Sequence, residues 1–360
     1  MAEAQNTADP MEVDGGAYAP GQLQEVVQKE GFLGPVTAMF WDSKEHVLLA
    51  GRGCDILILD FDRVCLGSLR PFQEGRVHVI KSQSRSNRKL LVAASSEKHV
   101  TLSEVHFSDE SQKTLLSKAT VGKLPLLEDW VLDLQLLRPS SDGGSDSSSW
   151  ELLAVGLAHN TVEIWNWVSS SKISTCRCET NPLLCSLAFF GDTPDILKVA
   201  CGGFTREVLC WRVQAAAAPA RIEHRLRGHT GVIHCVKWRA DGKLLISASE
   251  DRCVRVWEAE AGPDQGPIPA LQQSHVLWGH SARIWDCRIW RDVVVSSSED
   301  GTGRVYRLGA ATEGATSTTE RPVESLAVLK GHQGKHVWRC EVCAVGDEWK
   351  AATGGNDAAI

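Results

Sequence analysis

The sequence predicts an all-β fold, a β-propeller built from repeated units of short strands. Short apolar segments bounded by Gly, Asn, Asp or Ser recur along the chain, as in LLAVGL at 152–157, LLISAS at 244–249 and VVVSSS at 293–298. Segments of this length and composition are typical of strands. A longer unit that contains them also recurs at a fixed spacing, and repetition of a four-stranded unit is the signature of a propeller.

Three copies of the longer unit are clear, at 228–257, 279–306 and 331–360. Each copy begins with Gly-His, continues through alternating apolar residues and reaches an Asp in a polar turn. The histidines are about 50 residues apart, and in the first two copies an aromatic residue follows the Asp by six positions. This order matches the WD repeat, in which Gly-His comes early and Trp comes late. The predicted fold is therefore a WD40-type β-propeller.

Weaker copies upstream raise the count of units to about seven. ELLAVGLAHNTVEIW ends at Trp165, ILKVACGGFTREVLCW ends at Trp211, and two more degenerate units precede them. Seven is an ordinary blade number for a propeller. The sequence thus predicts a propeller domain of about seven blades over 21–360, after a disordered tail at 1–20.

The third clear copy stops at Ile360, before its aromatic residue. We therefore expect the last blade to be incomplete and the sequence to be a fragment or a truncated gene product. An exposed sheet edge promotes aggregation, and WD propellers cover theirs with a strand from the opposite end of the chain. The segment QLQEVVQK at 22–29 is the candidate for that strand.

The polar residues that recur in the clear copies are predicted to form structural hydrogen-bond networks. By residue type, each set of His, Ser or Thr and Asp also resembles a hydrolase triad. A triad should occur once, however, and this set recurs at matching places in every clear copy. Buried polar groups that are fully hydrogen-bonded fix a fold. The predicted network residues are His229, Ser247, Asp251 and Trp257 in the first copy, His280, Ser296, Asp300 and Tyr306 in the second, and His332, Thr353 and Asp357 in the third.

Two tryptophans are candidates for partner binding. Trp285 and Trp338 follow the Gly-His turn by five or six residues, where the chain enters an inner strand near the rim of the propeller. Beside them stand Arg283 in one copy, and Lys335 and His336 in the other. Aromatic and basic residues on a rim can form a binding hot spot. Burial of the two tryptophans between blades is the competing interpretation.

The tetrapeptide WDCR at 285–288 matches the WDxR pattern of propellers that serve as substrate receptors of ubiquitin ligases. In those proteins the motif closes the third strand of a repeat. Here it lies in the opening strand, so the match is interpreted as chance. The sequence also lacks a P-loop, a dinucleotide-binding glycine pattern after a strand, and HExxH. No catalytic residue is therefore predicted.

Composition points to a soluble, intracellular protein, and no metal or cofactor site is predicted in the chain itself. The formal net charge is -7, whereas a chain that binds nucleic acid alone usually has a basic face, so neither DNA nor tight RNA binding is the first expectation. No secretory signal and no apolar run of the roughly 20 residues that cross a membrane is found. The 12 Cys include only two close pairs, Cys176 with Cys178 and Cys340 with Cys343, and their spacings do not match as those of a four-ligand zinc site usually do.

The last copies resemble the WD repeat-containing protein 6 family in more than the general repeat. That family carries GHSAR(V/I)W in one blade and GHQG…TGG(D/N)D…I in the next, and the chain has GHSARIW at 279–285 and GHQG at 331–334 with TGGND at 353–357. SASEDRCVRVW at 247–257 resembles the family's preceding blade, whereas Tyr306 replaces the usual Trp.

The resemblance implies a non-catalytic, cytoplasmic regulatory subunit. Its partner would be an FtsJ-like tRNA 2′-O-methyltransferase, which would hold S-adenosylmethionine and carry out the chemistry. The propeller would position tRNA, bound through the complex, so that the wobble ribose is methylated. A link to endosomal recycling in fungal relatives is also implied. A generic interaction scaffold, such as a ubiquitin-ligase or chromatin adaptor, and a propeller hydrolase are the alternatives left open.

Overall fold

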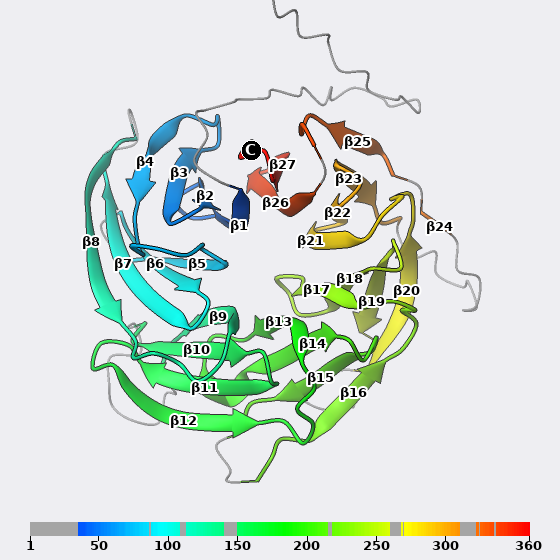
Figure 1. Cartoon of the computed structure of the whole chain (residues 1–360), viewed down its shortest axis with the longest axis horizontal. Helices are drawn as coiled ribbons and strands as arrows, with labels where there is room; N and C mark the ends of the chain where they lie inside the picture. The colour runs from blue at the N-terminus through cyan, green and yellow to red at the C-terminus, as the bar shows by residue number, and fades with distance from the viewer. Residues whose placement is uncertain are drawn as a thin grey trace, which may run out of the picture.

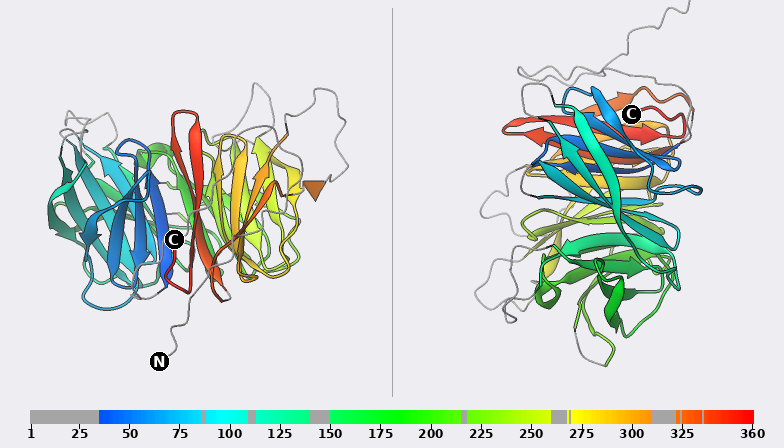
Figure 2. Two further views of the ribbon diagram at one scale, coloured as in Figure 1. Left: turned by 90° about the horizontal axis from the view of Figure 1, so that it is seen from above. Right: turned by 90° about the vertical axis from the view of Figure 1, so that its left-hand side faces the viewer.

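The computed structural model confirms the predicted all-β propeller: antiparallel sheets stand in a ring around a central axis (Figure 1). It describes residues 35–85, 88–108, 113–139, 150–214, 218–259, 268, 270–309, 322–323, 325–334 and 336–360. Edge-on, the strands run between the two faces of the ring (Figure 2). In the described part of the chain, the one helical element is the 3-10 turn η3, Pro194–Ile196.

The strands fall into four concentric layers. The inner strands are β1 (Val36–Asp42), β5 (Val79–Ser84), β9 (Val131–Leu137), β13 (Leu184–Phe190), β17 (Ile233–Trp238), β21 (Ile284–Trp290) and β26 (Val337–Val345). The second layer holds β2 (Val47–Arg52), β6 (Lys89–Ser96), β10 (Leu152–Leu157), β14 (Lys198–Gly203), β18 (Leu244–Ser249), β22 (Val293–Ser298) and β27 (Glu348–Gly355). The third holds β3 (Asp55–Asp60), β7 (His99–Phe107), β11 (Thr161–Asn166), β15 (Val208–Arg212), β19 (Val254–Ala259) and β23 (Thr302–Arg307). The outer layer holds β4 (Cys65–Leu69), β8 (Leu115–Lys123), β12 (Ser171–Arg177), β16 (Ile222–Leu226), β20 (Leu271–Leu277) and β25 (Ala327–Lys330).

The second strands explain why the sequence shows short, continuous apolar runs. Every residue of β2, β10, β18 and β22 is buried, since each face of these strands packs against a neighbouring blade. Strands covered on both faces carry apolar residues without alternation. The outer strand β8, in contrast, is exposed over most of its length. The core of the molecule therefore lies between the blades.

The predicted number of blades is corrected. The structure has six complete blades, and one of them adds the short strand β24 (Pro322–Val323) beside β20 in parallel. In the place of a seventh blade stands the two-stranded hairpin β26–β27. Within the described residues the last unit supplies only these two strands, as expected for an incomplete last blade, and the number of complete blades is six rather than about seven.

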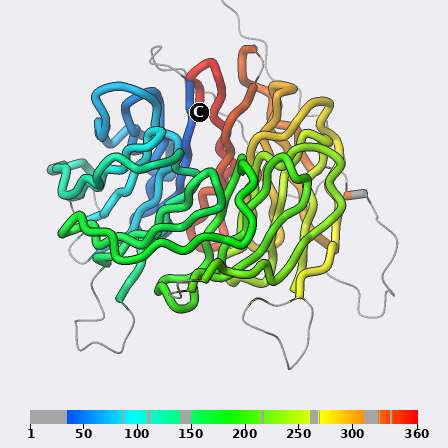
Figure 3. The backbone as a smooth tube through the Cα atoms, turned by 60° about the horizontal axis from the view of Figure 1, so that its bottom comes forward, coloured from blue at the N-terminus to red at the C-terminus, as the bar shows by residue number. Residues whose placement is uncertain are grey.

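The hairpin closes the ring between the last complete blade and the first (Figure 3). Nε1 of Trp41 in β1 donates a hydrogen bond to the Ala344 carbonyl (3.2 Å). Nε of Arg339 in β26 donates to the Thr37 carbonyl (2.8 Å). The hairpin and the first sheet also share an apolar core cluster that includes Cys343. Closure thus joins segments some 300 residues apart in the sequence.

Some predictions fall on residues outside the described ranges. These are the disordered tail at 1–20, the start of the propeller domain at 21 and the closing strand at 22–29. They stay predictions. Among the described residues, no helix has the length and apolar character needed to cross a membrane.

Candidate functional site

The first clear copy forms a continuous chain of hydrogen bonds across its blade. Nε1 of Trp257 donates to Oγ of Ser247 (2.9 Å), and that hydroxyl lies 2.8 Å from Nε2 of His229. Nδ1 of His229 lies 2.8 Å from Oδ2 of Asp251, which also accepts the Thr230 N–H (3.0 Å). Because Ser247 accepts from Trp257, its proton is free to go to Nε2, and Nδ1–H then donates to Asp251. A neutral imidazole therefore satisfies every group in the chain.

The other two copies repeat this geometry with one part changed. His280 bridges Asp300 and Ser296, at 2.8 Å each. His332 bridges Asp357 and Thr353, at 2.9 Å each. In the second copy Tyr306 takes the place of the tryptophan. Its hydroxyl is buried, and no hydrogen-bond partner for it is found in the described part of the chain. Ten of the eleven predicted network residues take part in these hydrogen bonds, whereas Tyr306 does not within the described part of the chain.

The networks have the residue types of a hydrolase, but a substrate could not reach their hydroxyl groups. Ser247 and Ser296 are fully buried, and both ring nitrogens of His229 and of His280 already have a partner in the network. A nucleophile must reach a substrate, and its base must be free to take the proton. These groups join the Gly-His turn to the second strand of the blade and to the turn that follows that strand.

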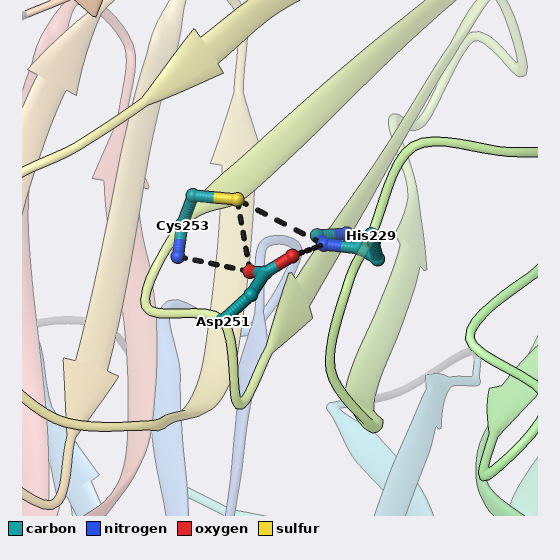
Figure 4. A group of neighbouring side chains, drawn as sticks. All are labelled: His229, Asp251 and Cys253. Atoms are coloured by element: carbon teal, nitrogen blue, oxygen red, sulfur yellow. Dashed lines mark hydrogen bonds and ion pairs between the residues drawn. The ribbon is translucent and has the colours of Figure 1, made fainter.

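Cys253 joins the first network and creates a group that could hold a metal ion by geometry alone (Figure 4). One ligand atom each from His229, Asp251 and Cys253 lies within 4.8 Å of the others. A structural zinc site needs four ligands, and thiolate is the ligand form. Burial and the neighbouring Asp251 raise the pKa of the Cys253 thiol, which favours S–H as donor to Asp251 (2.9 Å). Thr302 makes the corresponding bond to Asp300 in the second copy, so the trio is interpreted as part of the network.

The charge states in the second network follow from its contacts. Burial raises the pKa of Asp300, but the hydrogen bonds from His280, Thr302 and the Ser281 N–H outweigh it and hold the pKa well below its usual range. Burial lowers the pKa of His280 below its ordinary value, although Asp300 opposes this. Near neutral pH the pair is therefore a carboxylate and a neutral imidazole, which is the pairing that the hydrogen bonds require.

Acidification is expected to destabilise the fold, beginning below about pH 6.5, the ordinary histidine pKa. A histidine whose pKa is lower in the folded state binds fewer protons there. Its contribution to stability is present above the unfolded pKa and is lost as the pH falls. Burial lowers the pKa of four histidines: His78, His234, His275 and His280. Urea unfolding from pH 8 to pH 5 should show a constant free energy above pH 7 and a decline below pH 6.5. A flat profile down to pH 5 would contradict these directions.

The candidate binding residues gather at the rim of the central channel. The ring of Trp285 lies 5.0 Å from that of Trp338, and His336 stacks on Trp338 at 5.0 Å. The guanidinium of Arg283 lies 5.4 Å from the Trp285 ring, and its Nε contacts Glu299 at 2.6 Å. All four predicted residues are partly buried. The fifth, Lys335, lies outside the described residues.

Sequence reasoning missed His234, which belongs to the same cluster. Its ring lies 4.7 Å from the Trp285 ring. The signal was present in the register of the copies. His234, Trp285 and Trp338 each follow the apolar residue that opens an inner strand. We define the rim cluster as His234, Trp285, His336 and Trp338.

The WDCR tetrapeptide lies in β21, an inner strand, and does not close a repeat. Its Asp286 and Arg288 form an ion pair at 2.6 Å and line the central channel. This location agrees with the register argument made from the sequence.

Comparison with known proteins gives two findings, one for a single repeat and one for most of the chain. The family description "WD domain, G-beta repeat" matches residues 220–258, which run from β16 to β19. The chain is also similar to the tRNA (34-2′-O)-methyltransferase regulator WDR6 of Bos taurus, with 27% identity over 329 residues that cover 87% of this chain. The resemblance to the WD repeat-containing protein 6 family is thereby confirmed. The relative of the same name from Homo sapiens is 27% identical over 237 residues, or 65% of this chain.

The match covers only part of the relatives. The chain spans 26% of the length of the bovine protein. A shorter similarity, 32% identity over 169 residues or 44% of this chain, is found to telomerase protein component 1 of Rattus norvegicus. Because that match is confined to less than half of the chain, the similarity to the methyltransferase regulators has the wider reach.

Proposed function

We propose that this chain is a non-catalytic WD-repeat subunit that binds an FtsJ-like 2′-O-methyltransferase and positions tRNA for ribose methylation at the wobble nucleotide. The observation that carries the proposal is the similarity to regulators of tRNA (34-2′-O)-methyltransferase over 87% of the chain. S-adenosylmethionine would be held by the partner enzyme. The complex would work in the cytoplasm.

The arrangement of the polar residues supports a subunit without chemistry of its own. The His, Ser or Thr and Asp sets recur in three copies, and their hydroxyls are buried or half-buried within the networks. Because these polar groups bond to one another and hold the turns in place, the side chains available for docking are those on the surfaces of the ring. Rigid presentation of a partner and a substrate is how a non-catalytic subunit accelerates a reaction.

The rim cluster, with Arg283 beside it, is the surface we propose for docking the methyltransferase. Tryptophan and arginine are the residue types that dominate binding energy at protein interfaces. Here they are held rigidly, since Arg283 is fixed by Glu299 and the rings pack on one another. A preorganised surface loses little conformational entropy on binding.

The test of the function is deletion of the gene followed by mass spectrometry of tRNA. We expect 2′-O-methylation of the wobble nucleotide to be lost from the tRNAs that carry it and to return when the gene is restored. Unchanged methylation would defeat the proposal and favour a generic interaction scaffold. The surface is tested separately, by binding of the methyltransferase to Trp338→Ala. We expect affinity to fall roughly 30-fold, as for a hot-spot residue. Trp278→Ala, an exposed tryptophan outside the rim cluster, is the control and should bind normally.

A further inference from the structure

The inner strands put charged side chains at fixed levels of the central channel. In β1, β13, β17, β21 and β26 the register shifts between the first and third residues of the strand, so their positions correspond from blade to blade. The cavity on the axis has a volume of about 270 Å³. Its charged lining consists of four cations and three carboxylates: Lys81, Lys237, Arg288, Arg339, Asp133, Asp286 and Glu341.

The carboxylates of the channel are all paired. Lys81 contacts Asp133 at 3.2 Å. Arg288 contacts Asp286 at 2.6 Å and Glu341 at 3.2 Å. Two cations thus neutralise most of the charge of three acids, and those acids have little capacity left for another cation.

Within the described residues, Lys237 and Arg339 have no carboxylate at ion-pair distance, although the positive charges of both act on Asp286 in the same cavity. Across the described ranges, no hydrogen bond or ion pair is found for the side chain of Lys237, although this residue is partly buried. Arg339 donates only to backbone carbonyls, those of Thr37 (2.8 Å) and Trp338 (3.2 Å). The lining therefore holds one more cation than it has carboxylates, and a desolvated charge in excess is costly unless an anion pairs with it.

The positive charges also act on one another across the channel. Burial lowers the pKa of Lys81, Asp133 opposes this, and the charges of Lys237 and Arg288 lower it further. An anion on the axis would relieve this repulsion. Two residues that line the same cavity, Trp285 and His234, each have a buried ring nitrogen (Nε1 and Nε2) for which no hydrogen-bond partner is found in the described part of the chain.

We propose that the axial channel binds a small molecule with a diphosphate group, through Lys237 and Arg339. Arg339 is the third residue of β26 and Lys237 the fifth of β17, so the two stand about 6–7 Å apart along the axis, two residues of a strand. The two phosphate groups of a diphosphate can pair with cations at two levels of the channel, and lysine is a common point-charge ligand of phosphate. One phosphate ester already carries a charge of about -1.5 to -2 near neutral pH, so a diphosphate supplies enough negative charge to pair with both Lys237 and Arg339. This site does not depend on the proposed function.

The test is thermal unfolding and calorimetric titration of the 360-residue chain with pyrophosphate. We expect pyrophosphate to raise Tm relative to sodium chloride of equal ionic strength. Lys237→Met should weaken binding at least tenfold, and Lys237→Arg, which keeps the charge, should retain it. Lys44→Met, at an exposed lysine in the β1–β2 turn outside the channel, is the matched control and should bind like the unmodified chain.

A second readout separates binding from folding. Lys237→Met removes an unpaired, partly buried cation, so its Tm without pyrophosphate should be equal to or higher than that of the unmodified chain. If Lys237→Met does not fold, Arg339→Gln replaces it and should show the same loss of binding. The proposal is wrong if sodium chloride raises Tm as much as pyrophosphate does, or if pyrophosphate binds equally well after either substitution.

Discussion

Asp300→Ala is expected to lower the free energy of unfolding by about 3–5 kcal/mol, the range for breaking a buried pair. The carboxylate accepts hydrogen bonds from Nδ1 of His280 (2.8 Å), from the Ser281 N–H (3.0 Å) and from the N–H and hydroxyl of Thr302 (3.0 and 2.6 Å). Alanine would leave these donors without their acceptor, and the His280 side chain, which is 0% exposed, could not turn to water for another. The loss is large because four hydrogen bonds, one of them from a fully buried imidazole, depend on one side chain.

The measurement is urea unfolding near pH 7, where Asp300 is ionised. Asp347→Ala is the control, because the side chain of Asp347 is 93% exposed and pairs with Arg291 on the surface. Its effect should stay within about 0.5 kcal/mol. Asp300→Asn keeps the shape and one acceptor oxygen, so it should lie between the two. If Asp300→Ala costs no more than Asp347→Ala, the network does not stabilise the fold.

The networks could be predicted from the sequence because they are local and repeated. His229 and Asp251, like His280 and Asp300, lie in one repeat at nearly constant separation, and any geometry that joins one pair joins the other. The same hydrogen-bond pattern could therefore be recognised in the sequence three times. The strand pattern was recognisable for the same reason, since each blade repeats the same burial.

Contacts between blades were not predictable in this way. Trp211 ends one of the weaker copies of the repeat, and it is fully buried. Its Nε1–H, however, donates to Oδ1 of Asn160, which belongs to the preceding blade (3.0 Å). The serine of the clear copies has no counterpart here, because Cys201 occupies the second strand at this level. Repeat periodicity describes one blade and carries no information about such substitutions across two blades.

The arrangement of the central channel and the contacts that close the ring also depend on residues from different blades, so the repeats did not predict them. The rim cluster combines residues from three units, and His234 differs in type from the tryptophans at the corresponding positions. The paired and free charges on the axis depend on which strands face one another across the ring. Ring closure between β26 and β1 depends on residues some 300 positions apart, which no local pattern relates.

Trp211→Ala is expected to lower the free energy of unfolding by about 3–5 kcal/mol, the range for truncating a buried aromatic residue. Trp211 is 0% exposed and packs in a cluster formed by two neighbouring blades, with Leu187 and Val162 among its members. The substitution would leave a cavity at that junction and remove the hydrogen bond to Asn160. Trp278→Ala, at a tryptophan that is 44% exposed, is the control and should cost less than about 1 kcal/mol.

The cost of the cavity and the cost of the lost hydrogen bond can be separated with Trp211→Phe. Phenylalanine fills most of the space but cannot donate to Asn160, so it should cost about 1–2 kcal/mol, mainly through the buried amide oxygen left with weaker partners. Because the cluster belongs to two blades, Trp211→Ala should shift the unfolding midpoint of the whole ring as one transition, monitored by circular dichroism and by tryptophan fluorescence. A separate early transition in Trp211→Ala would mean that the blade of β13–β16 unfolds alone. Coupling through Trp211 and Asn160 would then be too weak to join the two sheets.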